Sequence, residues 1–218
     1  MIRQSPDNGR AHLNYGLAQR TAGDLAGARQ SFERCAEAWP RYAFCDINQA
    51  VLALDERRLP DAERSIARAE RLLPDNVYVR LWRGNVERAA ERWVEAEAAY
   101  RGALALAPQL TSARNGLAFA LFMQSRIEEA TPLFDALSAE GQLDANGLYA
   151  RGFLADRAGE SVIAAGLYRA ALALEPTHPR AGYNLAVLLQ KGGDLLGAIT
   201  AYDGLRSRGA ATPDALYN

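Results

Sequence analysis

The sequence has very little histidine, cysteine or lysine, and these shortages exclude several kinds of site. His12 and His178 lie near opposite ends of the chain, so they cannot share a metal ion. Cys35 and Cys45 are too few for a disulfide scaffold, and no second cysteine pair completes a zinc site. The two cysteines flank a predicted turn between helices, where a disulfide is conceivable, but we expect two buried thiols because free cysteine behaves as a small hydrophobe.

The sequence also has no excess of charge of one sign and no long apolar run. The 25 basic and 26 acidic residues leave a formal net charge of −1, and both signs are mixed along the chain. Nucleic-acid binding requires a concentrated basic face, so no nucleic-acid partner is expected. No apolar run is long enough to cross a bilayer, and no signal peptide is recognisable at the N-terminus. We predict no membrane insertion of this segment; the cytoplasm and the periplasm both stay open.

Motifs that carry enzymatic chemistry are absent as well. The sequence contains no Gly-rich phosphate loop, no Gly-x-Ser-x-Gly elbow and no His-Glu-x-x-His pair. Neighbouring acids such as Glu128 and Glu129 are expected on solvated helix faces. Arg83 is expected to pair with Glu87, one helical turn further on. We therefore predict a non-enzymatic protein with no catalytic residues, no cofactor and no metal.

What the sequence does contain is a repeat of 34 residues. Prolines follow this spacing, with one step doubled: Pro6, Pro40, Pro74, Pro108 and Pro176. The same step joins a ladder of alanines: Ala28, Ala62, Ala96, Ala130, Ala164 and Ala198. It also joins a ladder of large residues: Phe32, Ile66, Tyr100, Phe134, Tyr168 and Tyr202. A third ladder holds small residues only: Gly16, Ala50, Gly84, Ala118, Gly152 and Ala186.

Each repeat unit fits two short amphipathic helices joined by a tight turn. The small residue of the first helix and the alanine of the second allow the helices to approach closely, and the large residue fills the space toward the next unit. Proline ends the second helix because its ring disfavours further helix. Gly23, Gly159 and Gly193 form turns between the helices. Where the turn glycine is missing in the second unit, Pro60 stands near the start of the second helix.

This pattern resembles the tetratricopeptide repeat (TPR) family, especially in the stretch GYNLAVLLQKGGDLLGAITAYDGL at residues 182–205. The resemblance implies an all-α fold, a right-handed α-solenoid that occupies essentially the whole chain. Repeat four departs from the pattern, with Gln142 in place of the last proline and Pro132 inside its second helix, so we expect a mild irregularity without a break. Six repeats and the start of a seventh are predicted: 9–42, 43–76, 77–110, 111–144, 145–178, 179–212 and 213–218.

Both ends of the array are expected to be incomplete. Pro6 is the final proline of a repeat whose body is absent, and PDALYN at residues 213–218 is too short for a capping helix. We therefore expect either a piece of a longer bacterial protein or an array whose open C-terminal end packs on another copy, as a homo-oligomer.

The family resemblance also implies a binding surface, because the first helices of successive TPR repeats line a concave groove. Asparagine amides can donate to and accept from an extended peptide backbone, and aromatic residues supply contact area. We expect the central anchors to be Tyr78, Trp82, Phe119, Tyr149 and Phe153. Carried over position by position, the groove presents Phe44, Asn48, Tyr78, Trp82, Asn85, Asn115, Phe119, Phe122, Asn146, Tyr149, Phe153, Tyr183 and Asn184.

Three functions fit these observations. The first is a non-catalytic scaffold that binds a peptide or a helix in its groove. Some family members clamp a chaperone's carboxyl terminus with basic residues; here those positions hold Leu13, Leu17, Asn48, Tyr78 and Trp82, and only the asparagine matches, so that ligand is not expected. The second is an accessory region of a larger enzyme, such as a membrane-bound glycosyltransferase. The third is a self-assembling scaffold.

Overall fold

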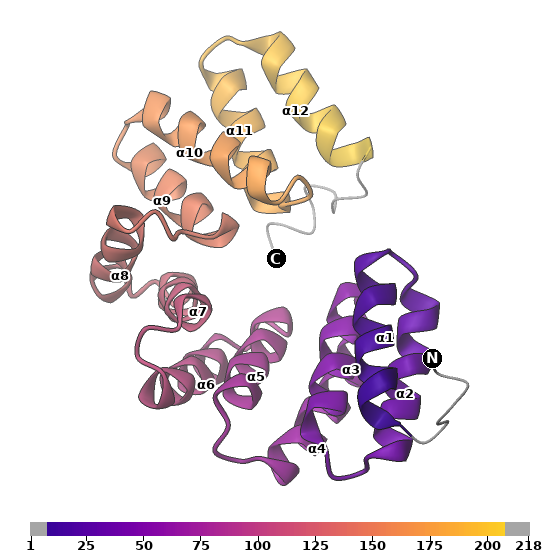
Figure 1. Cartoon of the computed structure of the whole chain (residues 1–218). Helices are drawn as coiled ribbons and strands as arrows, with labels where there is room; N and C mark the ends of the chain where they lie inside the picture. Colours follow the sequence, from indigo (N-terminus) through magenta and orange to yellow (C-terminus); the bar gives the residue numbers. More distant parts are fainter. Residues whose placement is uncertain (1–7, 208–218) are drawn as a thin grey trace. The chain divides into compact units, whose positions relative to one another are not determined.

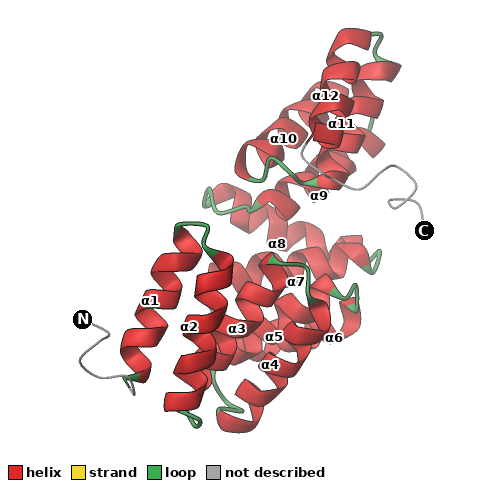
Figure 2. Ribbon diagram, turned by 90° about the vertical axis from the view of Figure 1, so that its right-hand side faces the viewer, coloured by secondary structure: helices red, strands yellow, loops and turns green. Residues whose placement is uncertain are grey.

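The computed structural model describes residues 8–207, and this range contains helices and no strand (Figures 1 and 2). The predicted all-α repeat fold is therefore confirmed. The helices are α1 (Gly9–Thr21), α2 (Leu25–Ala38), α3 (Ala43–Asp55), α4 (Leu59–Leu72), α5 (Val77–Ala89), α6 (Trp93–Leu106), α7 (Thr111–Met123), α8 (Ile127–Ala139), α9 (Ala145–Arg157), α10 (Ser161–Leu174), α11 (Pro179–Lys191) and α12 (Leu195–Ser207).

The chain forms two compact units, Met1–Ala120 (unit 1) and Leu121–Asn218 (unit 2), and the boundary falls within α7. In unit 1, the helices pack as the hairpins α1–α2, α3–α4 and α5–α6, and each hairpin contacts the next one along the chain. In unit 2, α9–α10 and α11–α12 form hairpins, and α11 contacts both α9 and α10. Each unit therefore has the stacked-hairpin architecture that the repeat pattern predicts.

The large residue of each second helix packs where the first helix carries a small residue. A Cβ atom added to Gly16 would come within 2.6 Å of the Phe32 ring, and one added to Gly84 within 2.5 Å of the Tyr100 ring. Tyr100 also lies over Gly116 of α7, where a Cβ atom would come within 2.4 Å of the ring. The small residues therefore make room for these rings, both within a hairpin and from one hairpin to the next.

The turns inside the hairpins share one backbone conformation. Gly23, Gly159 and Gly193 have φ values of 82°, 81° and 83°, in the left-handed region that glycine adopts readily. At the equivalent position of the other repeats, the same region holds residues with side chains, at φ values of 57°, 55° and 60°: Arg57, Glu91 and Ser125. The fold therefore keeps the turn even where the sequence lacks the glycine.

The two prolines singled out in the sequence both lie within helices. Pro60 lies in the first turn of α4, where its missing N–H group is tolerated. Pro132 lies inside α8, which nevertheless runs as one helix from Ile127 to Ala139. We expect no break in the array at repeat four; the continuity of α8 does not test that expectation, and the boundary between units 1 and 2 falls in the same repeat, within α7.

The prediction for the cysteines is wrong. Cys35 of α2 and Cys45 of α3 form a disulfide, and both side chains are fully buried. Their Cα atoms lie 5.7 Å apart, a distance typical of a disulfide. The two positions meet because the second helix of one hairpin packs against the first helix of the next, a contact that composition alone does not reveal.

Candidate functional site

The most exposed aromatic surface of unit 1 follows the starts of α3 and α5. The ring centroids of Trp39 and Tyr42 lie 5.1 Å apart, those of Tyr42 and Phe44 5.4 Å, and those of Phe44 and Tyr78 6.3 Å. We call these four residues the aromatic strip. Tyr78 is 49% exposed, Trp39 and Tyr42 are exposed to a lesser degree, and Phe44 is half-buried. Three exposed rings joined through a half-buried one form an apolar surface of a kind that binds other molecules.

Two members of the strip were missed by the sequence reasoning. Trp39 and Tyr42 lie at the end of α2 and just before α3, outside the positions that the family pattern assigns to a groove. The signal that could have found them is the pair of aromatic residues on either side of Pro40, in a connection where loop residues are usually polar.

Further along α5, predicted site residues continue the surface. Tyr78, Trp82 and Asn85 are spaced by four and three residues, so they share one face of the helix. Trp82 is half-buried and packs against a core cluster that includes Ile47 and Val51. Asn85 Oδ1 accepts a hydrogen bond of 2.9 Å from the Tyr100 hydroxyl. That bond fixes the amide so that its Nδ2 group can donate elsewhere.

The other asparagines are also held by the fold. Asn48 Nδ2 donates to the carbonyl oxygen of Phe44 at 2.8 Å. In α7, Asn115 is 2% exposed, and its Nδ2 donates to the carbonyl oxygen of Thr111 at 3.1 Å. Asn115 is therefore buried, whereas Asn48 keeps part of its side chain in solvent.

Several predicted aromatic anchors are buried in the core. In unit 1, Phe119 is 2% exposed and packs edge-on against Trp93, with centroids 5.8 Å apart. In unit 2, Phe122 and Tyr149 are also buried, and their rings lie 6.2 Å apart. The half-buried Phe153 covers both, at 5.6 Å from Phe122 and 6.4 Å from Tyr149. Phe153 is therefore the accessible member of this unit 2 cluster.

Burial has electrostatic consequences for the tyrosines of unit 2. Desolvation raises the pKa of the Tyr149 hydroxyl, against the attraction of Arg180 and a hydrogen bond with Asn184. Desolvation also raises the pKa of Tyr168 to about 12, although its hydroxyl accepts a hydrogen bond of 3.4 Å from Asn184 Nδ2. Both hydroxyls therefore stay protonated at neutral pH.

The remaining predicted residues lie half-buried on unit 2. Asn146 belongs to the first turn of α9, and Tyr183 belongs to α11, where its ring packs on Tyr202 at 6.1 Å. Asn184, on the same helix, is tied to Tyr168 as described above. All three side chains are partly accessible, and the amide of Asn184 is held by the Tyr168 hydroxyl.

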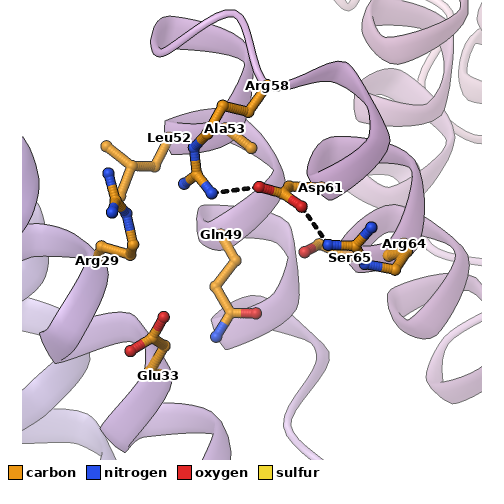
Figure 3. Close-up of a pocket in the computed structure, with 9 residues that line it drawn as sticks. All are labelled: Arg29, Glu33, Gln49, Leu52, Ala53, Arg58, Asp61, Arg64 and Ser65. Atoms are coloured by element: carbon orange, nitrogen blue, oxygen red, sulfur yellow. Dashed lines mark hydrogen bonds and ion pairs between the residues drawn. The ribbon is translucent and has the colours of Figure 1, made fainter.

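A hollow between α2, α3 and α4 of unit 1 was not anticipated from the sequence (Figure 3). Arg58 and Arg64 both point to Asp61 and pair with it, and Arg29 pairs with Glu56. Each of these arginines is already neutralised by a carboxylate, so the hollow is an ion-paired seam between neighbouring helices. Its volume is about 320 Å³, and it is lined by Arg29, Glu33, Gln49, Leu52, Ala53, Arg58, Asp61, Arg64 and Ser65.

Both histidines are buried in the fold. His12 is buried in α1, and His178 is buried at the start of α11, where its Nδ1 accepts a hydrogen bond of 3.1 Å from the backbone N–H of Ala181.

The predicted pair of Arg83 and Glu87 is confirmed, with 2.6 Å between Nε and Oε1. Within residues 8–207 we find no cluster of side chains suited to a metal ion, and no helix there is long and apolar enough to span a membrane.

Fold and surface together define an all-helical repeat protein that exposes aromatic side chains on its first helices. The chain belongs to the tetratricopeptide repeat family. One family profile of that description matches residues 2–43, 47–111 and 149–215, and a second matches residues 87–152.

Two curated bacterial proteins, both named cellulose synthase operon protein C, are similar in sequence. The protein from Pseudomonas fluorescens is 30% identical over 179 residues, which cover 78% of this chain and 14% of that protein. The one from Xanthomonas axonopodis is 32% identical over 181 residues, which cover 78% of this chain and 12% of that protein. The chain thus spans only a small part of the curated relatives that it matches.

Solved structures share the fold at low sequence identity. The Cut9–Hcn1 complex of the APC/C superposes with a TM-score of 0.81 at 17% identity, over 98% of this chain and 42% of that one. PilF of Pseudomonas aeruginosa gives 0.67 at 17% identity, over 94% and 93% of the two chains. The first TPR domain of RPAP3, bound to an HSP90 peptide, gives 0.52 at 20% identity, over 54% and 93%.

Proposed function

We propose that this chain is a non-catalytic scaffold that binds a peptide or a helix of another protein. The observation that carries the proposal is the aromatic strip of unit 1, continued along α5 by Trp82 and Asn85. Exposed aromatic rings bury much area with few rotatable bonds, and the amide of Asn85 can bond to a peptide backbone. The TPR fold supports this proposal, as does the neighbouring RPAP3 domain with its bound peptide.

Within this proposal, the predicted site residues take two roles. On unit 1, Tyr78 and Trp82 act as accessible anchors, and on unit 2 Phe153 does so separately, since each keeps part of its ring in solvent. Phe119 and Tyr149 are buried and support the surface from beneath. A ligand therefore meets fewer aromatic side chains than the repeat positions alone predict.

A displayed random-peptide library selected on the intact chain provides the test. For a selected peptide, Tyr78→Ala and Trp82→Ala are each expected to weaken binding by about 2 kcal/mol, or roughly 30-fold, as central anchors do. Val94→Ala is the matched control, because Val94 is 65% exposed on α6, away from the strip. Circular dichroism checks that each variant keeps its helix content. If the Tyr78 and Trp82 variants bind as tightly as the parent and Val94→Ala loses affinity, the binding surface lies elsewhere.

The names of the curated relatives favour a second candidate function. Both relatives are called cellulose synthase operon protein C, so we propose that this TPR array serves as one segment of a larger scaffold for a polysaccharide synthase. The test is to isolate the full-length parent protein from its bacterium and to identify synthase subunits that co-purify. Co-purification that survives in the parent but is lost when these repeats are deleted supports the candidate; unchanged co-purification contradicts it.

A further inference from the structure

The disulfide closes a short loop that carries most of the aromatic strip. Cys35 and Cys45 have a sequence separation of 10 and join α2 to α3. Trp39, Tyr42 and Phe44 all lie between the two cysteines, and the fourth ring of the strip belongs to α5. The covalent link and most of the strip therefore belong to one segment of the chain.

Backbone hydrogen bonds connect the two cysteines through residues of the strip. The N–H group of Trp39 donates to the carbonyl oxygen of Cys35 at 2.9 Å, and the N–H group of Tyr42 donates to that of Trp39 at 3.0 Å. The N–H group of Cys45 then donates to the carbonyl oxygen of Tyr42 at 3.0 Å. The backbone positions of Trp39 and Tyr42 therefore depend on where the two cysteines are held.

Phe44 connects the strip with the core around the disulfide. Its half-buried ring packs against the core cluster that contains Cys35 and Cys45. The same ring neighbours Tyr42 and Tyr78 in the strip, with centroids 5.4 Å and 6.3 Å away. A change in the packing of the cysteines therefore reaches the strip through a side chain as well as through the backbone.

The repeat itself does not require a disulfide at this contact. Steps of 34 residues carry the two cysteine positions to residues without thiols, and these are fully buried as well. The connections at 73–76 and 107–110, which match the one that holds Trp39 and Tyr42, contain no aromatic residue. The disulfide thus occurs where the connection exposes aromatic rings. The equivalent pairs of unit 1 are Ala69 with Val79 and Ala103 with Ala113.

We propose that the Cys35–Cys45 disulfide is a clamp that keeps the aromatic strip in its binding geometry, so that the oxidised chain binds a peptide well and the reduced chain binds it poorly. The inference rests on the proposed peptide binding at the strip and adds redox control of that site. Two non-bonded sulfur atoms need more space than two bonded ones, and both cysteines are fully buried in a close-packed contact. Reduction therefore loosens the α2–α3 contact and frees the loop, and a ligand must then order that loop again.

The redox step exchanges one disulfide for another. When the clamp forms, its two thiols give two electrons and two protons to an oxidant disulfide, such as glutathione disulfide, whose own S–S bond becomes two thiols. Reduction by a dithiol is the reverse reaction. Because both cysteines are buried, a reductant reaches the sulfur atoms only when the α2–α3 contact opens locally. A bound peptide that favours the closed contact should therefore slow the reduction.

Peptide binding in the two redox states provides the first test. The probe is a peptide selected from a displayed random library on the oxidised chain, whose affinity falls in Tyr78→Ala. Dithiothreitol reduces the disulfide, the chain has no other cysteines, and mass spectrometry after alkylation measures the reduced fraction. Reduction should raise the dissociation constant of the peptide at least about tenfold, and reoxidation with glutathione disulfide should restore it.

Two variants remove the clamp without a reductant. Cys35→Ala/Cys45→Ala copies the pair found two repeats later and should bind as weakly as the reduced parent, with no response to dithiothreitol. Cys35→Ala/Cys45→Val, which copies the pair one repeat later, replaces it if the first variant does not fold. Ala103→Gly is the matched control, because it weakens a helix at the position equivalent to Cys35 but lies on α6, away from the strip. It should keep the affinity of the parent.

Hydrogen exchange tests the clamp without a ligand. In the reduced chain, the amides of Trp39 and Tyr42 should exchange at least about tenfold faster than in the oxidised chain, whereas amides of α6 should keep their rates. An equal acceleration in α6 would make the disulfide a general support of unit 1 and overturn the inference.

The outcomes separate this inference from the proposed function. An oxidised parent that binds no peptide through the strip overturns both. An oxidised parent that binds, together with a reduced parent and a clamp-free variant that bind within about twofold of it, overturns the clamp alone.

Discussion

At the scale of single residues, the hairpin turns hold a conformation that three of their residues do not favour. Arg57, Glu91 and Ser125 adopt positive φ, where a Cβ atom crowds the backbone and costs about 1–2 kcal/mol. The neighbouring repeats place glycine at the same position without that cost. The two helices of each hairpin must therefore impose the turn, whichever residue stands there.

Arg57→Gly and Ser125→Gly are each expected to raise the free energy of unfolding. Removing the side chain relieves the strained conformation, and the greater freedom of glycine in the unfolded chain offsets part of the gain, which leaves about 0.5–1 kcal/mol. Urea unfolding followed by circular dichroism measures the change. Gly23→Ala is the control with the opposite sign, since Gly23 has φ of 82° in the same turn. A loss of stability in both glycine variants would contradict this explanation.

The buried Asp46 links stability to pH. Its Oδ1 lies 3.4 Å from Arg68 Nε, yet burial raises the pKa of the carboxyl group above its usual value despite the attraction of Arg68 and Arg71. The folded state therefore keeps this proton to higher pH than the unfolded chain. The stability linked to Asp46 is full below the unfolded pKa and is lost as pH rises through the folded pKa.

Asp46→Asn is accordingly expected to raise the free energy of unfolding at about pH 7 and to change it little at about pH 3, where the aspartate is protonated in both states. Urea titrations at the two pH values measure the difference. The control is Asp55→Asn, which removes an exposed partner of Arg20 and should have a small effect. Destabilisation of Asp46→Asn at neutral pH would mean that the arginines outweigh the burial.

At the scale of elements, the hairpins depend on glycines at helix contacts. An aromatic ring of the paired helix occupies the space that a side chain at the glycine would need. Gly84→Ala places a Cβ atom 2.5 Å from the buried Tyr100 ring, so it should cost about 1–3 kcal/mol through overpacking. Gly166 lies in α10 with nothing within 4 Å of an added Cβ atom. Gly166→Ala should therefore add about 0.5–1 kcal/mol from helix propensity alone. Thermal unfolding of both variants tests the contrast, and equal effects of the two substitutions would contradict it.

The helices themselves were predictable because the ladders of alanine, large and small residues repeat in register, and each ladder reports a contact that every hairpin makes. The disulfide was not predictable in the same way. Cys35 and Cys45 meet only when two hairpins stack, and no other repeat has cysteine at these positions. The left-handed turns at Arg57 and Ser125 were missed for a related reason, since only a glycine makes such a turn visible in a sequence.

The sequence placed the proposed site residues on first helices but did not show how deeply each side chain is buried. The repeat positions place Phe119, Phe122 and Tyr149 on first helices, and that is where they lie. Whether such a residue reaches solvent depends on its neighbours: Trp93 covers Phe119, and Phe153 covers Phe122. The exposed strip at Trp39 and Tyr42 arises between helices, where the repeat pattern says little.

At the scale of the whole molecule, the free energy of unfolding of a repeat array is close to a sum. Each hairpin contributes its own stability, and each interface between neighbouring hairpins adds a further contribution. An inner hairpin such as α5–α6 has a described hairpin on each side, whereas α12 is the last helix among residues 8–207. Leu195, Leu196 and Ile199 are each more than half exposed there, at 60%, 79% and 57%. Within residues 8–207, α12 therefore buries less of its apolar surface than an inner helix, and it should open at a lower free energy than α6.

Hydrogen exchange on dilute protein measures that difference. Amides in the middle of α12 are expected to exchange at least about tenfold faster than those in the middle of α6, because opening α12 exposes less buried apolar surface. Equal protection of α12 and α6 would contradict this explanation.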